Sequence, residues 1–277
     1  MRMRASLILI ALGLAGMLWS SSNRPRRPPE VAEPPATWIN KIGHLLGPGR
    51  LLVRDVLWFR LLEDIELGRT WRAKGQMELL VQLSPHEIEA WKYLGQHLAY
   101  DVAATTVDPA ERQSWVDEGT HRIEEGLRHH PDSKVLHYTL ARLLTPWQVI
   151  ESSEAEPGPE EDRALEHLAM ATREPDPLFD ALYLEGTLLR RRASRAILAR
   201  DFESAQRHWA ASEMVHRRIE RLIVELSTEP DPLVLEPLWS EYCHAWLRLL
   251  EGDESARALI ETFPRDHERD LLLDQLD

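Results

Sequence analysis

The chain of 277 residues is poor in the residues that most often build disulfides, strands and phosphate sites. It has one cysteine, Cys243, so an intramolecular disulfide is excluded. The apolar context WSEYCHAW predicts that Cys243 is a small buried side chain rather than a nucleophile. Alternating valine-rich runs are missing, which argues against β-strands. The formal net charge of −13 opposes binding to a phosphate backbone, so nucleic acid is not an expected partner.

The motifs that mark common catalytic sites are also missing. The sequence has no GxxxxGK[ST] phosphate loop, HExxH zinc pair, CxxC or GxSxG elbow. GPGR at 47–50 lacks the lysine of a phosphate loop and is interpreted as a turn before a helix. His208 and His216 could share one helical face, but a rise of about 12 Å between them excludes a shared ion. We therefore expect no metal, no cofactor and no enzymatic activity.

The N-terminus has the composition of a targeting segment. Two arginines precede an apolar run, Ala5 to Trp19, that is shorter than the roughly 20 residues of a comfortable membrane span. Residues 1–22 are predicted to be a signal anchor or a signal peptide, and 23–37 a Pro/Arg-rich linker. The protein would then sit in a membrane through residues 5–22, or be exported if the signal is cleaved. Arginines on both sides of the run leave the orientation open, and an internal apolar helix is a third alternative.

From about residue 50 the apolar residues follow a helical period that proline-containing turns interrupt. These turns are SPHE at 84–87, HPDS at 130–133, EPDP at 174–177, EPDP at 229–232 and FPRD at 263–266. The first three prolines lie 46 and 44 residues apart, and the last two lie 34 apart. A turn that recurs at such intervals is typical of stacked helical hairpins.

The residues between the turns repeat as well. The first helix of each unit has a small residue at one position of its apolar pattern: Gly95, Ala141, Gly186 and Ser240. A glycine inside a helix is unfavourable by itself, so Gly95 predicts the close approach of a second helix. The second helices repeat a pattern of small and large residues: Ala73, Met77 and Leu80; Gly119, Ile123 and Gly126; Ala164, Leu168 and Ala171; Ala205, Trp209 and Ser212.

This pattern resembles the tetratricopeptide-repeat (TPR) family. The likeness spans residues 50–264 as about five units, with 265–277 as a possible capping helix, and it is strongest from Trp91 to Pro131. It implies an all-α fold over 50–277, an α-solenoid of about five antiparallel helix hairpins with a C-terminal capping helix. Several units exceed 34 residues, with insertions such as DVAATTVDPAER and QVIESSEAEPGPEED between paired helices. An α-solenoid with longer repeats is the structural alternative.

The resemblance also implies a function. TPR proteins bind protein partners on the face formed by their first helices, and the corresponding partner-binding positions here are Lys92, Gln96, Tyr138, Arg142, Tyr183, Thr187 and Arg190. We expect a membrane-tethered scaffold or adaptor at the cell envelope. The alternatives are a permanent structural subunit of a membrane transport or secretion complex and an α-superhelical envelope enzyme. The basic stretch RRRASRAILAR at 190–200 is interpreted either as a grip for an acidic partner or lipid headgroups, or as a solvated helix face.

Overall fold

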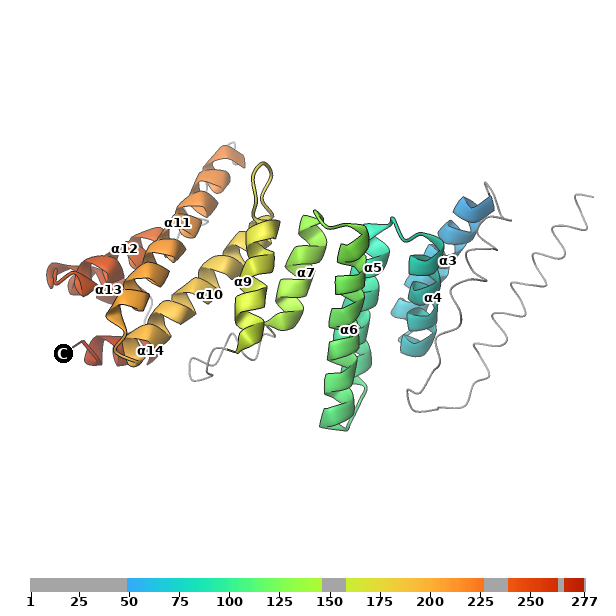
Figure 1. Cartoon of the computed structure of the whole chain (residues 1–277), viewed down its shortest axis with the longest axis horizontal. Coiled ribbons are helices and arrows are strands. Elements are labelled where there is room, and N and C mark those ends of the chain that lie inside the picture. Colours follow the sequence, from blue (N-terminus) through green and yellow to red (C-terminus); the bar gives the residue numbers. More distant parts are fainter. Residues whose placement is uncertain (1–48, 146–157, 227–238, 264–266, 277) are drawn as a thin grey trace, which may run out of the picture. The chain divides into compact units, whose positions relative to one another are not determined.

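A computed structural model describes residues 49–145, 158–226, 239–263 and 267–276. All regular secondary structure in these residues is helical, which confirms the all-α part of the prediction (Figure 1). The predicted anchor and linker, and the predicted turn at 229–232, lie outside the described residues. Among the helices of the described part, none has the length and apolarity needed to cross a membrane.

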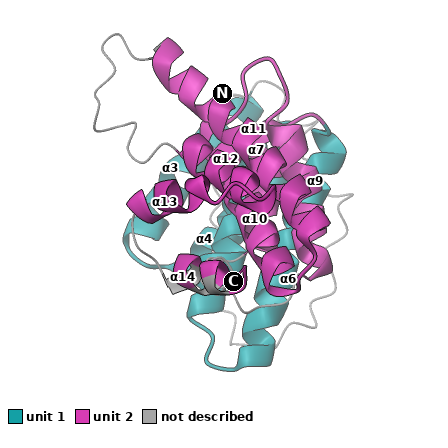
Figure 2. Cartoon of the chain, turned by 90° about the vertical axis from the view of Figure 1, so that its left-hand side faces the viewer, with its two compact units in different colours: residues 1–131 teal, residues 132–277 magenta. Residues whose placement is uncertain are grey.

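The described chain divides into two compact units, residues 49–131 and 132–276 (Figure 2). Unit 1 contains α3 (Gly49–Glu66), α4 (Thr70–Leu83), α5 (Ile88–Gln96), the π-helix η1 (His97–Val102) that continues α5, and α6 (Pro109–His129). Helix α3 packs against α4, and α5 with η1 packs against α6. The two pairs are joined because α4 also packs against α5 and η1.

Unit 2 repeats this plan of packed helix pairs. It contains α7 (Lys134–Leu144), α9 (Pro159–Ala171), α10 (Phe179–Leu198), α11 (Phe202–Leu226), α12 (Trp239–Leu250), α13 (Ser255–Thr262) and α14 (His267–Asp274). The pairs are α7 with α9, α10 with α11, and α12 with α13. Helix α9 also packs against α10, and α11 against α12, so each pair contacts the next. The last helix, α14, packs against α10.

The helix boundaries follow the local sequence signals. The first three predicted proline turns lie between α4 and α5, between α6 and α7, and between α9 and α10. Ser133 ends the second of these turns, and its side chain accepts a hydrogen bond from the Leu136 backbone N–H at 3.4 Å. The Asp108 carboxylate caps α6 by accepting from the Ala110 N–H at 3.1 Å, and Pro109 supplies the first helical residue.

Gly95 of the repeat pattern lies where α5 and α6 cross, as predicted. A Cβ placed on Gly95 would lie 2.4 Å from the Ile123 Cδ1 atom, and one on Gly119 would lie 2.5 Å from the Gly95 carbonyl oxygen. Glycine is therefore required in both helices of this pair.

The pattern predicted for the second helices lies in the interior of the pairs. All of its residues are buried: Ala73, Met77, Leu80, Gly119, Ile123, Gly126, Ala164, Leu168, Ala171, Ala205, Trp209 and Ser212. The interior of each of these pairs is thus filled by apolar and small side chains, whose burial stabilises the fold.

The structure corrects the prediction for one insertion. The sequence predicts that DVAATTVDPAER, 101–112, is an insertion between paired helices, but only Thr105–Asp108 lie outside helices. The extra residues instead lengthen both helices of the pair, because η1 continues α5 and Asp108 and Pro109 start α6 directly after the turn.

Candidate partner-binding surface

The predicted partner-binding residues of unit 1 lie on α5. Lys92 is half-buried, and its ammonium group donates to Glu89 Oε2 at 2.7 Å and lies 5.2 Å from the centre of the Tyr93 ring. Gln96 is half-buried at the last residue of the helix. Lys92 therefore presents a cation beside an aromatic ring, an arrangement that suits a carboxylate or an amide of a peptide.

Helix α7 carries the next two predicted residues, Tyr138 and Arg142. Tyr138 is half-buried and packs against the apolar core between α7 and α9, which includes Ala141 and Leu168. Arg142 is exposed, and its guanidinium carbon lies 5.8 Å from the centre of the Tyr138 ring. The structure thus brings these two residues together as a cation–π pair at the edge of the core.

Helix α10 carries the remaining three. Tyr183 is 50% exposed, and the Thr187 hydroxyl donates to the Tyr183 carbonyl oxygen at 2.9 Å, which ties it to its own helix. Arg190 is half-buried, with its guanidinium carbon 3.9 Å from the centre of the Trp239 ring of α12. Arg190 therefore joins two helix pairs of unit 2, a role that the repeat pattern did not predict.

A polar cluster that the sequence did not indicate lies beside Arg190. Ser212 of α11 donates to the Gly186 carbonyl oxygen of α10 at 3.1 Å, and Cys243 Sγ of α12 lies 3.5 Å from Ser212 Oγ. A Cβ on Gly186 would lie 2.8 Å from His216 Nε2, so this glycine is needed to admit the imidazole. Small and polar side chains thus fill the crossing of three helices.

The pKa values in this polar cluster are those of groups buried in a packed interior. Burial, together with the charge of Arg190, lowers the pKa of His216 to about 3, so the imidazole is neutral near pH 7. Burial also raises the pKa of Cys243 to about 11, against the lowering effect of its hydrogen bond with Ser212. A thiol that stays protonated is a poor nucleophile, and Cys243 is fully buried as predicted.

Two arginines of the 190–200 stretch, Arg192 and Arg195, form ion pairs inside unit 2. Glu161 of α9 is buried, and its Oε1 atom accepts from Arg192 Nε at 2.8 Å and from Arg195 Nη2 at 2.5 Å. Arg192 also forms an ion pair with Asp162. These contacts hold α9 and α10 together, and they favour a structural role for the stretch over a free basic patch.

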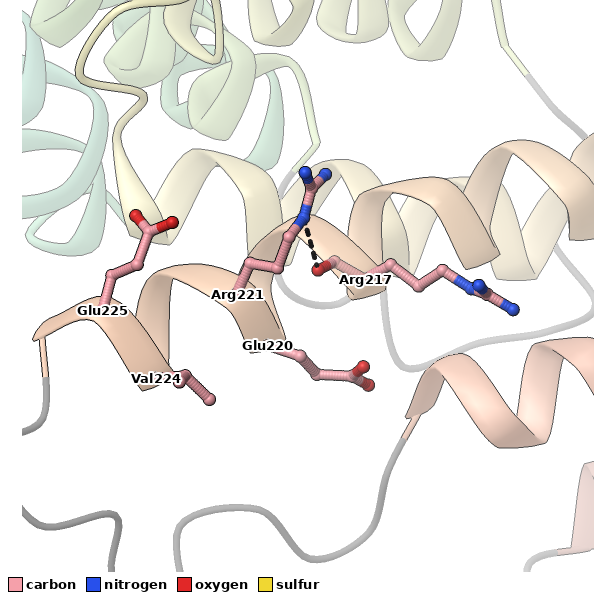
Figure 3. A pocket seen from close by; sticks show the side chains of 5 residues that line it. All are labelled: Arg217, Glu220, Arg221, Val224 and Glu225. Atoms are coloured by element: carbon pink, nitrogen blue, oxygen red, sulfur yellow. Dashed lines mark hydrogen bonds between the residues drawn. The ribbon is translucent and has the colours of Figure 1, made fainter.

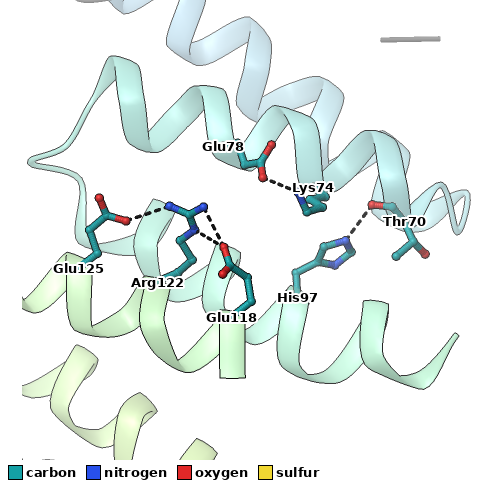
Figure 4. Close-up of polar contacts among 7 residues, drawn as sticks. All are labelled: Thr70, Lys74, Glu78, His97, Glu118, Arg122 and Glu125. Atoms are coloured by element: carbon teal, nitrogen blue, oxygen red, sulfur yellow. Dashed lines mark hydrogen bonds and ion pairs between the residues drawn. The ribbon is translucent and has the colours of Figure 1, made fainter. Parts of the chain in front are cut away.

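A second set of charged contacts lies in unit 1, where α4 faces η1 and α6 (Figure 4). Arg122 of α6 donates to Glu118 Oε1 at 2.9 Å and to Glu125 Oε2 at 3.0 Å, and Lys74 of α4 pairs with Glu78. His97 Nε2 lies 2.9 Å from the Thr70 carbonyl oxygen, which bridges η1 and α4. Each of these groups has a partner within the helical framework, so their arrangement is that of a structural network.

One surface hollow, of about 650 Å³, follows the C-terminal half of α11 (Figure 3). It is lined by Arg217, Glu220, Arg221, Val224 and Glu225. Arg221 Nε donates to the Arg217 carbonyl oxygen at 3.4 Å, and Glu220 Oε1 accepts from the Ser240 N–H at 3.3 Å. Among the described residues, all those that line the hollow come from this one helix.

A buried carboxylate with a raised pKa is the group that an envelope hydrolase would need. Burial raises the pKa of Glu185 on α10, while a hydrogen bond with Thr172 and the charge of Arg218 lower it. Glu185 is not among the residues that line the hollow on α11. Within the described residues, moreover, no group of three or more metal-ligating side chains is placed to hold an ion.

Exposed apolar residues gather on α3, the first described helix of unit 1. Six apolar residues along it are at least 39% exposed: Leu51, Leu52, Val56, Phe59, Leu62 and Ile65. Trp58 of the same helix is instead packed, because its indole N–H donates to Glu87 Oε1 at 3.1 Å and its ring meets Tyr93 edge-on. A contiguous apolar face of this kind is typical of a contact surface.

Comparison with known proteins adds no family to this description. No protein-family profile, no curated protein and no solved structure matches the chain.

Proposed function

We propose that the protein is a membrane-tethered, TPR-like scaffold that binds protein partners at the cell envelope. The observation that carries this proposal is the repeated packing of helix pairs within each unit, each pair in contact with the next, with small residues at the crossings. Pairs that stack in this way form an α-solenoid, in which α14 would be the capping helix. Because apolar and small side chains fill the interior of each pair, the polar residues of the first helices remain outside it, where they can bind a partner.

The first helices offer cations beside aromatic rings. Lys92 lies over Tyr93 on α5, and Arg142 over Tyr138 on α7. Tyr183 adds a half-exposed ring on α10. Such groups suit an acidic segment or the C-terminal carboxylate of a partner. Tethering through residues 5–22 is part of the proposal and is supported by the apolar run that follows Arg2 and Arg4.

Cross-linked pull-down from membranes tests this function. The variant Lys92→Glu/Arg142→Glu/Tyr183→Ala reverses two cations and removes one ring, all on first helices. It should lose partner capture while its circular dichroism stays unchanged, because these side chains are not fully buried. The matched control is Arg128→Glu/Arg207→Glu/Met214→Ala, which makes equivalent changes on the exposed surface of second helices. Capture that survives in the first variant, or is lost equally in both, would refute the proposal.

The exposed apolar face of α3 favours a second function, that of a permanent structural subunit of a membrane complex. Permanent interfaces are larger and more apolar than transient ones. In that case Leu52→Ser/Phe59→Ser should release the protein from its complex on native gels, whereas the first-helix variant should remain bound. Both variants remaining bound would exclude this alternative.

A further inference from the structure

The apolar face of α3 is arranged for a helix-like partner. Leu52, Val56 and Phe59 are 71%, 54% and 73% exposed, and their spacing of four and three residues places them in one row. The same helix carries both acidic and basic residues, and its Asp55 carboxylate is paired with Arg54 Nη2 at 2.9 Å. The occupant of this face therefore needs apolar residues at helical spacing.

A segment with these properties directly precedes α3. Residues 37–46, TWINKIGHLL, have Trp38, Ile42 and Leu45 at a spacing of four and three. The segment contains Lys41 and His44 and no acidic residue. Its apolar row thus has the same period as the apolar row of α3.

The short connection between residues 37–46 and α3 determines how their two apolar rows align. Only Gly47 and Pro48 separate the segment from α3, which begins at Gly49. A connection this short is typical of two antiparallel neighbours. In an antiparallel arrangement Leu45 meets Leu52, Ile42 meets Val56, and Trp38 meets Phe59, because the two rows run in opposite directions from the same turn.

We propose that residues 37–46 dock on the exposed apolar face of α3. The contact adds one more packed element ahead of the first helix pair of unit 1. It also fixes the position at which the linker, residues 23–37, connects to the helical repeats. The face is then occupied by the protein itself, so it does not serve as the interface of a permanent subunit.

Thiol labelling of the full-length protein in detergent micelles tests this docking. The native Cys243 is fully buried and stays unlabelled, so single cysteines report their own sites. Phe59→Cys is compared with Met214→Cys, because these two side chains are 73% and 70% exposed in the described structure. Docking should slow the maleimide reaction of Phe59→Cys about tenfold relative to Met214→Cys, since the site must open before it reacts. Equal rates would overturn the proposal.

A second substitution identifies what covers the face. Adding Ile42→Asp to Phe59→Cys should restore the labelling rate to that of Met214→Cys, because the row of residues 37–46 is broken. Asn40→Asp introduces the same charge off the row and should leave the protection unchanged. Protection that persists with Ile42→Asp would mean that detergent, lipid or another protein covers the face, and would refute docking.

A disulfide cross-link tests the register independently. Trp38→Cys/Phe59→Cys should oxidise to a disulfide within one chain, whereas Trp38→Cys/Arg60→Cys, which moves the second thiol to the next exposed position, should oxidise far more slowly. A cross-link that instead joins two chains, with protection that grows with protein concentration, would assign the face to a second copy and overturn the proposal. Equal oxidation of both pairs would overturn the register.

Discussion

Substitution of Gly119 by alanine tests the closest helix contact of unit 1. A Cβ at this position would lie 2.5 Å from the Gly95 carbonyl oxygen, 2.9 Å from the Ala99 Cβ and 3.0 Å from the Ala99 backbone nitrogen. Two of these three atoms belong to the backbone of the partner helix. They cannot rotate away as a side chain can, so the two helices must separate to accept the methyl group.

The expected size of the effect is the sum of two opposing contributions. Alanine is favoured over glycine inside a helix by about 1 kcal/mol. Overpacking of a filled interior costs about 1–3 kcal/mol, and a clash with backbone belongs to the upper part of that range. Gly119→Ala should therefore lower the free energy of unfolding by about 2 kcal/mol despite its better helix propensity.

Gly75 on α4 provides the matched control. A Cβ at this position meets no atom within 4 Å, so Gly75→Ala should raise the free energy of unfolding by up to about 1 kcal/mol. Urea denaturation followed by circular dichroism measures both variants, and hydrogen exchange of α5 and α6 shows whether the loss is local to their contact. If Gly119→Ala is as stable as Gly75→Ala, the close packing described for this pair is wrong.

Two further predictions concern charges in unit 2. The pKa of His216 is lowered from its ordinary value of 6.5 to about 3 in the folded state, so below pH 6.5 the unfolded state binds more protons and stability falls as the pH is lowered. Between pH 6.5 and 5 the free energy of unfolding should fall by about 2 kcal/mol because of this residue. Denaturation curves of His216→Phe should lack this contribution to the pH dependence. Glu161→Gln leaves Arg192 and Arg195 without their shared buried carboxylate and should cost about 3 kcal/mol. Asp162→Asn, whose carboxylate is 72% exposed, should cost less than about 1 kcal/mol in the same denaturation assay, and equal losses would contradict this account.

The features that could be predicted from the sequence are those that depend on local spacing. The proline turns and the helical period depend on residues that are close in the sequence, and the small residue at Gly95 reflects a contact between neighbouring helices of one pair. The π-helical continuation of α5 could not be predicted in this way, because it has no clear sequence signal of its own.

The candidate site was harder to predict than the fold. The position of Arg190 came from the repeat pattern, but its stacking on Trp239 depends on how α10 and α12 pack, and these residues are far apart in the sequence. The engagement of Arg192 and Arg195 by Glu161 has the same origin. A dense run of arginines in a sequence is equally compatible with a free basic patch and with internal ion pairs. The two cases differ in whether a carboxylate from another helix, here that of Glu161, lies beside the arginines, and this depends on tertiary contacts.

The return of α14 to α10 has a mechanical consequence for unit 2. Leu272 and Leu273 of α14 share one apolar cluster with Ala193 and Ile197 of α10 and with Trp246 of α12. In a simple stack, tension on the chain end would peel off the last helices one after another. Because α14 instead packs against α10, a load on the C-terminus must break this contact before it acts on the packing of α12 against α11.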